Sequence, residues 1–477
     1  MAKLLKTGAG LFLARVLQPL FSFVLFWYCA RRLSLEDFGL YILLMSLILV
    51  FQAVATLGLG PMLTREISVD KEHGPQWIGA SLAVMLPGSL LAWALFVAFT
   101  VAAGYSPGMV QGAAIVGAGL PGAVLGQVAE SAFIAQGRSK PMVALSALEN
   151  GLRVGASVAA LTLGYGLQSL LVIHVVSRSL SGICALLMLR DGRPGLAVLS
   201  REKARALLRG IPSFGMMVLV ATFYFRMDII VVSLFMGEAA AGIYGAAMRL
   251  VSLTFLMPES LVAAIYPALS RTMHATDGHA RELTRFSAGL LAVVCTAVSL
   301  FLYGASSQLV PLLFGPGFVQ AGGLLAVLAF MLPLHAINGL LGFLLQSCRK
   351  ERTALRIVSW GTAGTLALYI LGVRLGGLEG AAWAGLIAMG SIALFHMWYV
   401  GTRIFPLGLA SAMALSLPGA VSGIAVGFWL PPVASALAAP ALFLGWLALV
   451  GVLRPAPLRC ALRLFAERGG APCASSS

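Results

Sequence analysis

Five arginines lie deep inside long apolar runs of this sequence: Arg15, Arg153, Arg178, Arg226 and Arg249. A charged side chain at the centre of a lipid bilayer costs roughly 2.5–3.5 kcal/mol on insertion scales. The guanidinium group stays charged at every accessible pH and offers paired hydrogen bonds to phosphate. Arginines in such runs must therefore face protein or water, and together they indicate a site that attracts a large anion.

The composition shows what surrounds these charges. Of the 477 residues, 60% are hydrophobic and only 10% are charged, and the mean hydropathy is +0.95. A soluble domain carries about 25% charged residues. The sequence therefore predicts an all-α polytopic membrane protein, in which each helix needs about 20 apolar residues to cross the bilayer.

Fourteen hydrophobic runs, bounded by Gly, Pro or charged residues, are predicted to span the membrane. They are Ala9–Ala30, Phe38–Pro61, Trp77–Ala103, Val110–Gln136, Met142–Leu163, Leu167–Leu189, Ile211–Phe235, Gly242–Tyr266, Phe286–Tyr303, Ala321–Gln346, Thr353–Val373, Leu378–Val400, Leu407–Leu430 and Ala434–Leu453.

The Lys and Arg residues between these runs predict the orientation. With the N-terminus inside, 24 of them fall in inside segments and 3 in outside loops. Positive charge accumulates on the cytoplasmic side of membrane proteins, so both termini are predicted to be cytoplasmic, in the cell (inner) membrane. The same bias explains nearly all of the net charge of +15, which leaves nothing for a nucleic-acid partner to explain.

No pattern in the sequence indicates catalysis, a cofactor or a metal. The six cysteines form no CxxC pair and have no metal-ligand spacing, so we interpret them as small hydrophobic residues. The longest outside loop, Gly304–Gln320, contains no charged residue. A membrane glycosyltransferase, polymerase or ligase would need acidic or histidine side chains in such a loop, so we expect a secondary transporter and not an enzyme.

Short motifs recur at about half the chain length. Phe38–Tyr41 matches Ala241–Tyr244 at an offset of 203, and Ala135–Lys140 matches Leu345–Lys350 at about 210. This repetition predicts two parallel six-helix lobes around a V-shaped central cleft. The predicted segments are residues 1–190 (first lobe), 191–210 (cytoplasmic amphipathic linker), 211–400 (second lobe), 401–453 (two further membrane helices) and 454–477 (basic cytoplasmic tail).

The buried polar residues divide into two groups of candidates. The residues expected to line the cleft and bind substrate are Arg15, Arg178, Arg226, Arg249 and Gln52, and those considered for ion coupling are His174, Asp228 and Glu259. At 100° per residue, Thr222, Arg226 and Ser233 share one strip of the seventh span, which favours Arg226 facing the cleft. Glu149 and Arg153, four residues apart, are expected to neutralise each other.

The linker sequence around Ser200–Gly210 predicts a short amphipathic helix, with Leu207 and Leu208 on one face and arginines on another. A surface helix that lies in the lipid headgroups is the simplest interpretation. The tail Arg454–Arg468 has the same character.

Motifs spread along the chain give it a family resemblance. They are Arg32–Tyr41, Leu57–Gly60, Thr64–Glu66, Glu238–Tyr244, Ala246–Leu250, Tyr266–Ser270, Leu313–Phe318 and Gly380–Trp383. On these residues the chain resembles the polysaccharide repeat-unit (Wzx-type) flippases of the multidrug/oligosaccharidyl-lipid/polysaccharide exporter superfamily. The resemblance implies fourteen helices and transfer of an undecaprenyl-diphosphate-linked oligosaccharide (an O-antigen, capsule or exopolysaccharide unit) across the cytoplasmic membrane. It implies membrane lipids, a polysaccharide polymerase and assembly proteins as partners, and a cationic cleft at Arg15, Arg226 and Arg249.

Two other kinds of transporter in the same superfamily are alternatives on the sequence alone. A cation-coupled drug exporter would be expected to carry acidic residues centrally, whereas arginines outnumber acidic residues inside these spans by five to four. A peptidoglycan-precursor flippase of the same fold differs only in its substrate.

Overall fold

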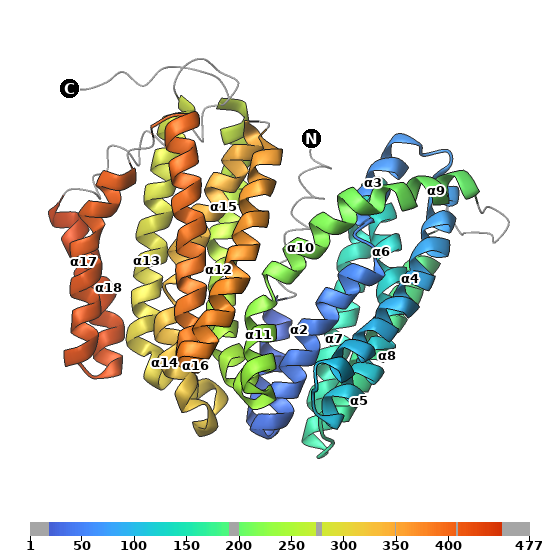
Figure 1. Cartoon of the computed structure of the whole chain (residues 1–477), viewed down its shortest axis with the longest axis horizontal. Helices are drawn as coiled ribbons and strands as arrows, with labels where there is room; N and C mark the ends of the chain where they lie inside the picture. Colours follow the sequence, from blue (N-terminus) through green and yellow to red (C-terminus); the bar gives the residue numbers. More distant parts are fainter. Residues whose placement is uncertain (1–18, 190–199, 273–278, 349, 407–408, 451–477) are drawn as a thin grey trace. The chain divides into compact units, whose positions relative to one another are not determined.

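The computed structural model describes residues 19–189, 200–272, 279–348, 350–406 and 409–450. Within these ranges the chain forms helices joined by short turns, and no β-strand occurs (Figure 1). The chain divides into two compact units, Met1–Gly245 and Ala246–Ser477. The division falls inside one helix, whereas the sequence grouped residues 211–400 together as a second lobe.

Unit 1 begins with a helix over residues 19–32. The helices that follow are α2 (Leu35–Ala55), α3 (Gly60–Val69), α4 (Gly74–Ala102), α5 (Pro107–Gly117), α6 (Leu120–Ala135), α7 (Ser139–Thr162), α8 (Leu167–Leu187), α9 (Arg201–Gly210), the π-helical turn η2 (Ile211–Gly215), α10 (Met216–Tyr224), α11 (Met227–Met236) and the start of α12 (Glu238–Thr272).

Polar caps begin two of the helices in unit 1. The Ser34 hydroxyl accepts a hydrogen bond from the Asp37 backbone N–H at 3.1 Å at the start of α2. Ser106 accepts from the Met109 N–H at 3.2 Å at the start of α5, where Pro107 has no N–H group and therefore needs no acceptor. From these starts, α2 and α5 pack on α4, and α6 packs on α4 and α8 (Figure 1).

Two glycines let α2 and the start of α12 approach closely within unit 1. A Cβ atom on Gly39 would overlap the Glu238 carbonyl, and one on Gly242 would lie 2.9 Å from Gly39 Cα. Gly245 packs in the same way on Ile42. Gly39 and Gly242 occupy equivalent positions of the motif that recurs at an offset of 203, so equivalent residues of the two copies touch each other here.

Unit 2 contains the rest of α12 and the remaining helices. These are α13 (His279–Phe314), the 3₁₀ turn η3 (Pro316–Phe318), α14 (Val319–Leu328), α15 (Met331–Ser347), α16 (Glu351–Arg403), α17 (Leu409–Trp429) and α18 (Pro432–Leu449).

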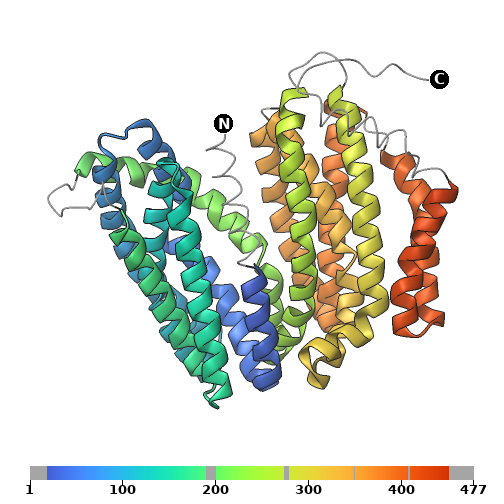
Figure 2. The same cartoon turned by 180° about the vertical axis from the view of Figure 1, so that it is seen from behind.

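Helix α13 is central to unit 2. It packs on α14, α15, α17 and α18, and α17 lies beside α18 in both views (Figure 2). The fully buried Leu300 of α13 meets Phe443 and Leu447 of α18 in an apolar core. The Ser299 hydroxyl donates to the Ala329 carbonyl at 2.7 Å, which satisfies a backbone group at the end of α14.

Helix α16 is two helices joined by a reversal. Gly376 and Gly377 leave the helical conformation, and Gly377 has φ +57°, which glycine adopts without strain. On the two sides of this turn, Gly372 and Gly380 face each other so closely that a Cβ on either would overlap the other's backbone.

Each of the fourteen predicted runs overlaps a helix of the structure. The part of the first run before residue 19 lies outside the described ranges. By length and hydropathy, eight of the described helices could cross a membrane, or up to ten if two bent pairs each count as one span. The count is lower than fourteen partly because α16 counts once and because α7 carries Lys140, Glu149 and Arg153.

Candidate functional site

Arg226 lies at a break in the seventh predicted span. Helix α10 ends at Tyr224 and α11 begins at Met227, with a bend of 59° between them. Arg226 is the residue before α11, with a non-helical φ of −131°. The prediction of one strip holding Thr222, Arg226 and Ser233 is therefore wrong, because the strip assumed one continuous helix across this bend.

Asp228 is buried in the first turn of α11, where a carboxylate interacts favourably with the helix dipole. It also interacts electrostatically with Arg226, although no ion pair joins these two side chains at 4 Å or less in the described part of the chain. The half-buried Arg226 thus places a positive charge at the bend, and the buried Asp228 places a negative charge in the first helical turn after it.

A second polar network joins the α4–α5 loop to the α11–α12 turn within unit 1. The Tyr105 hydroxyl lies 2.7 Å from the Ser233 hydroxyl, and Ser106 donates to Glu238 through its backbone N–H (3.1 Å) and its hydroxyl (2.9 Å). Burial raises the pKa of the Tyr105 phenol. The sequence analysis missed these bonds, because nothing in a single sequence pairs loops 130 residues apart.

Arg178 on α8 pairs with Glu149 on α7, with Nη1 and Oε1 2.8 Å apart. The expectation that Glu149 neutralises Arg153 on its own helix is therefore wrong, since the carboxylate reaches across to the neighbouring helix. Arg153 instead donates from Nη2 to the Asn150 side-chain carbonyl at 2.8 Å and to the Ser22 hydroxyl at 3.3 Å. Arg178, a predicted substrate ligand, thus has a carboxylate partner, while Arg153 has neutral ones.

His174 lies on α8 one turn before Arg178 and interacts electrostatically with both Arg153 and Arg178. Its Nδ1 is buried without a hydrogen-bond partner, as is Nε of Arg153. His174 therefore presents an unused ring nitrogen close to two guanidinium groups.

The other predicted cleft residues are spread over the chain. Gln52 is half-buried in the last turn of α2, where its backbone carbonyl accepts a hydrogen bond from the Thr56 hydroxyl at 3.0 Å. Arg249 is half-buried on α12 in unit 2. Arg15 lies outside the described residues, as does the basic tail from Arg454.

In unit 2, Glu259 on α12 meets His335 on α15, with Oε1 and Nε2 3.2 Å apart. The His335 ring stacks on Phe255 at a centroid distance of 4.1 Å, which fixes the ring's orientation. Glu259 remains 58% exposed while His335 is 14% exposed. The sequence marked both residues separately, but only the fold brings them together.

A neighbouring network involves the second histidine of unit 2. His396 Nδ1 lies 3.0 Å from the Asn338 side-chain oxygen, and the Asn338 amide donates to the Met389 carbonyl at 3.1 Å. The amide oxygen can only accept, so Nδ1 carries the proton. His396 is therefore a helix-to-helix contact.

The amphipathic linker helix is confirmed as α9, which packs on α4. Lys203 pairs with Asp70 at 3.0 Å and lies 5.0 Å from the centroid of the Trp77 ring. Leu207 is fully buried while Leu208 is 52% exposed, so the two leucines do not share one buried face. Hydrogen bonds from His73 and Lys203 hold the pKa of Asp70 well below its usual range.

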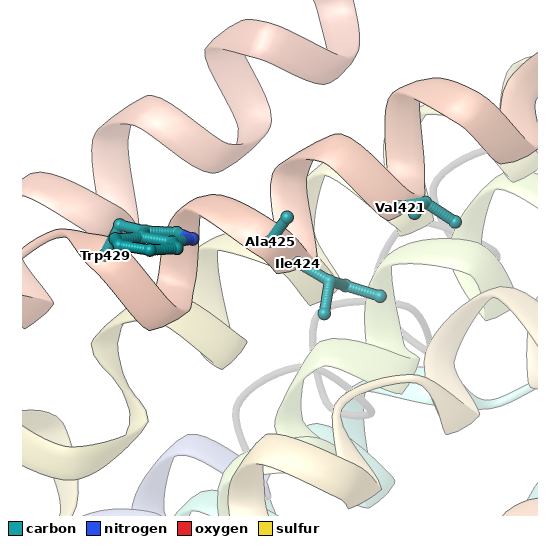
Figure 3. Close-up of a pocket in the computed structure, with 4 residues that line it drawn as sticks. All are labelled: Val421, Ile424, Ala425 and Trp429. Atoms are coloured by element: carbon teal, nitrogen blue, oxygen red, sulfur yellow. The ribbon is translucent and has the colours of Figure 1, made fainter.

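Metal ligands and a surface pocket are the remaining candidates for a binding site. Among the described residues, no group of three His, Cys, Asp or Glu side chains could hold a metal ion, and the described cysteines are unpaired. A pocket on one face of α17 is lined by Val421, Ile424, Ala425 and Trp429 (Figure 3). These apolar side chains offer an anion no favourable contact.

The sequence model of the polysaccharide biosynthesis protein family matches residues 4–273, which is more than half of the chain. The chain belongs to this family. This is a family of transporters and not of enzymes. One curated relative is the probable low-salt glycan biosynthesis flippase Agl15 of Haloferax volcanii, 21% identical over 406 residues and covering 84% of each chain.

Solved structures show which fold the family member adopts. The lipid II flippase MurJ in an inward closed conformation aligns with a TM-score of 0.73 at 14% identity, covering 94% of this chain and 98% of that one. An inward-facing multidrug transporter of the MATE family, in the MOP superfamily, aligns with a TM-score of 0.63 at 16% identity over 81% and 95%. The chain is therefore a multi-span membrane protein with the MOP fold.

Proposed function

We propose that this protein flips an undecaprenyl-diphosphate-linked oligosaccharide, an O-antigen, capsule or exopolysaccharide repeat unit, from the cytoplasmic to the outer leaflet of the cell membrane. Membership of a family of lipid-linked glycan flippases supports the general activity. The chemistry of the buried arginines supports a diphosphate as the group that links the glycan to its lipid.

The observation that carries the proposal is the excess of arginine inside the helices. Inside the predicted spans of unit 1, the arginines Arg15, Arg153, Arg178 and Arg226 outnumber the acidic residues Glu130, Glu149 and Asp228 by one. A buried permanent cation is costly unless something anionic meets it. A diphosphate that enters sideways from the lipid is such an anion, and guanidinium groups bind phosphate through paired hydrogen bonds.

We propose further that transport works by alternating access between two six-helix repeats. The contact of Gly39 with Gly242 supports this architecture, because equivalent residues of two copies can touch only where a two-fold axis passes between them. In this scheme the fourteen predicted spans have both termini in the cytoplasm, and Arg15, Arg178, Arg226, Arg249 and Gln52 contact the substrate. A polysaccharide polymerase and assembly proteins would receive the flipped unit.

Transporters of the two alternative substrates, a cationic drug and a peptidoglycan precursor, share this fold, so the fold alone does not identify the substrate. A cationic drug would be repelled by the surplus arginine charge in unit 1. A peptidoglycan precursor carries the same diphosphate, and the glycan flippase Agl15 among the relatives favours a polysaccharide unit over it.

The test is complementation of a strain that lacks this gene. Arg226→Ala and Arg249→Ala are each expected to abolish the surface glycan while the protein still inserts, which an immunoblot of membranes checks. Arg209→Ala, on the exposed face of α9, removes the same charge away from the membrane interior and is the matched control. Normal glycan in both test variants would contradict the proposal.

A further inference from the structure

A cluster of five polar side chains lies between α7, α8 and the helix over residues 19–32, all in unit 1. Its members are Ser22, Asn150, Arg153, His174 and Arg178, and Glu149 closes one side. All six side chains are buried or half-buried.

The charges of this cluster do not cancel. Glu149 is committed to Arg178 at 2.8 Å. The two hydrogen-bond partners of Arg153, the side chains of Asn150 and Ser22, are both neutral. Among the described residues, no carboxylate lies within 4 Å of the Arg153 guanidinium. One full positive charge is therefore left at Arg153.

Two nitrogens of the cluster also lack hydrogen-bond partners. Arg153 Nε and His174 Nδ1 are both buried from solvent and unbonded. More than nine in ten buried polar groups find a partner, and a buried donor left unsatisfied costs about 1–3 kcal/mol. An uncompensated cation beside two unused nitrogens is the arrangement that a bound oxyanion would complete.

The chemistry of the donors selects the anion. Nη2 of Arg153 already donates to Asn150 and Ser22, so Nε and Nη1 remain to donate to phosphate oxygens, which guanidinium groups bind through strong charge-assisted hydrogen bonds. His174 can add a third hydrogen bond when the proton lies on Nδ1. Arg178, which Glu149 holds in place, contributes long-range attraction without being free to swing away.

We propose that Arg153, positioned by Asn150 and Ser22 and assisted by His174, binds a phosphate group of the lipid-linked substrate. The inference rests on the proposed function for the identity of the lipid. It adds to that function a contact residue, Arg153, which the sequence assigned to structure, and it replaces the proton role considered for His174 with a role in binding.

The experiment measures binding to the full-length protein in phosphatidylcholine nanodiscs. The probes are radiolabelled undecaprenyl diphosphate, undecaprenyl monophosphate, phosphatidylglycerol and inorganic phosphate. Wild-type protein should bind the diphosphate lipid. Arg153→Ala should weaken that binding at least tenfold, because a charge-assisted hydrogen bond contributes about 1.5–3 kcal/mol and 1.4 kcal/mol is tenfold. Arg209→Ala is expected to bind within about twofold of wild type.

Asn150→Asp keeps the test decisive if truncation of Arg153 prevents folding. The substitution hardly changes the shape of the side chain and places a carboxylate on the guanidinium, 2.8 Å away in the present geometry. It should unfold at the same or a higher temperature than wild type without ligand, yet lose diphosphate binding about tenfold. Because Asn150→Asp neutralises Arg153 without removing it, a loss of binding with no loss of thermal stability separates a role in binding from a merely structural one.

Three results would overturn the inference in different ways. Unchanged binding by Asn150→Asp and Arg153→Ala would remove Arg153 from the site and leave the proposed function intact. Binding of phosphatidylglycerol, but not of the diphosphate lipid, with the same dependence on Arg153 would assign the site to a lipid headgroup. A wild-type protein that binds no diphosphate lipid would contradict the proposed function itself.

Discussion

Units 1 and 2 each hold a cluster of polar side chains between their helices, and the two clusters differ in chemistry. In unit 1, Glu149 pairs with Arg178, and His174 interacts electrostatically with Arg153 and Arg178, so positive charge is in excess. In unit 2, Glu259 meets one histidine, His335, and the adjoining His396 meets the Asn338 amide. The first cluster is built on permanently charged guanidinium groups and the second on histidine rings.

This difference suggests a division of labour within the flippase. Guanidinium groups keep their charge at all accessible pH values, which suits them to hold a diphosphate in every step of transport. The pair in unit 2 is a single hydrogen bond between His335 and Glu259, and the Glu259 side chain is 58% exposed. A contact of this kind can form and break as helices move, which suits it to a change of conformation more than to holding a diphosphate.

The largest effect is expected from Glu149→Gln in unit 1. The substitution leaves Arg178 without its carboxylate, and we expect a loss of about 2–3 kcal/mol in the free energy of unfolding, somewhat below the cost of breaking a fully buried pair. Thermal unfolding of the detergent-solubilised protein measures it. Glu259→Gln is the matched control in unit 2, and equal losses in the two variants would erase the distinction between the clusters.

Glu259→Gln should act on transport and leave stability nearly unchanged. A pair with one exposed partner contributes at most about 1 kcal/mol. Because the hydrogen bond links α12 to α15, the variant should transport more slowly than wild type at an equal amount of protein in the membrane. His335→Gln should have the same effect. A transport rate that matches wild type in both variants would show that the pair is only structural.

The smallest effect is expected from Asp70→Asn, at the contact of α9 with Asp70. Because hydrogen bonds from His73 and Lys203 lower the pKa of Asp70 in the folded protein, its contribution to stability is present above the normal carboxyl pKa. The contribution is lost as pH falls through the lowered value. The melting temperatures of wild type and Asp70→Asn should therefore differ slightly at pH 7 and converge in strong acid. A difference that is the same at both pH values would be inconsistent with this ion pair.

The sequence predicted the helices well, because runs of about 20 apolar residues and the Lys/Arg bias report directly on the bilayer. It also predicted the linker helix α9 and the family. Helix breaks were harder to predict. The bend at Arg226 has no proline or glycine to mark it, and the strip assigned to the seventh span failed there.

Pairs between helices were the least predictable part of the site. Glu149 has an arginine four residues away on its own helix, and the i,i+4 rule favours that partner. The carboxylate instead pairs with Arg178, 29 residues away, because α7 and α8 pack together. His335 and Glu259, 76 residues apart, were likewise recognised only as single candidates. Such partners depend on helix rotation and register, which one sequence does not specify.

Transbilayer movement in proteoliposomes tests the central claim most directly. A fluorescent undecaprenyl-diphosphate oligosaccharide is placed in one leaflet, and its appearance in the other is followed with a quencher that cannot cross the membrane. We predict that wild-type protein moves this lipid faster than protein-free liposomes do, and that Arg226→Ala protein does not. Equal rates for wild-type protein, Arg226→Ala protein and empty liposomes would contradict the assignment of this chain as a flippase for diphosphate-linked glycans.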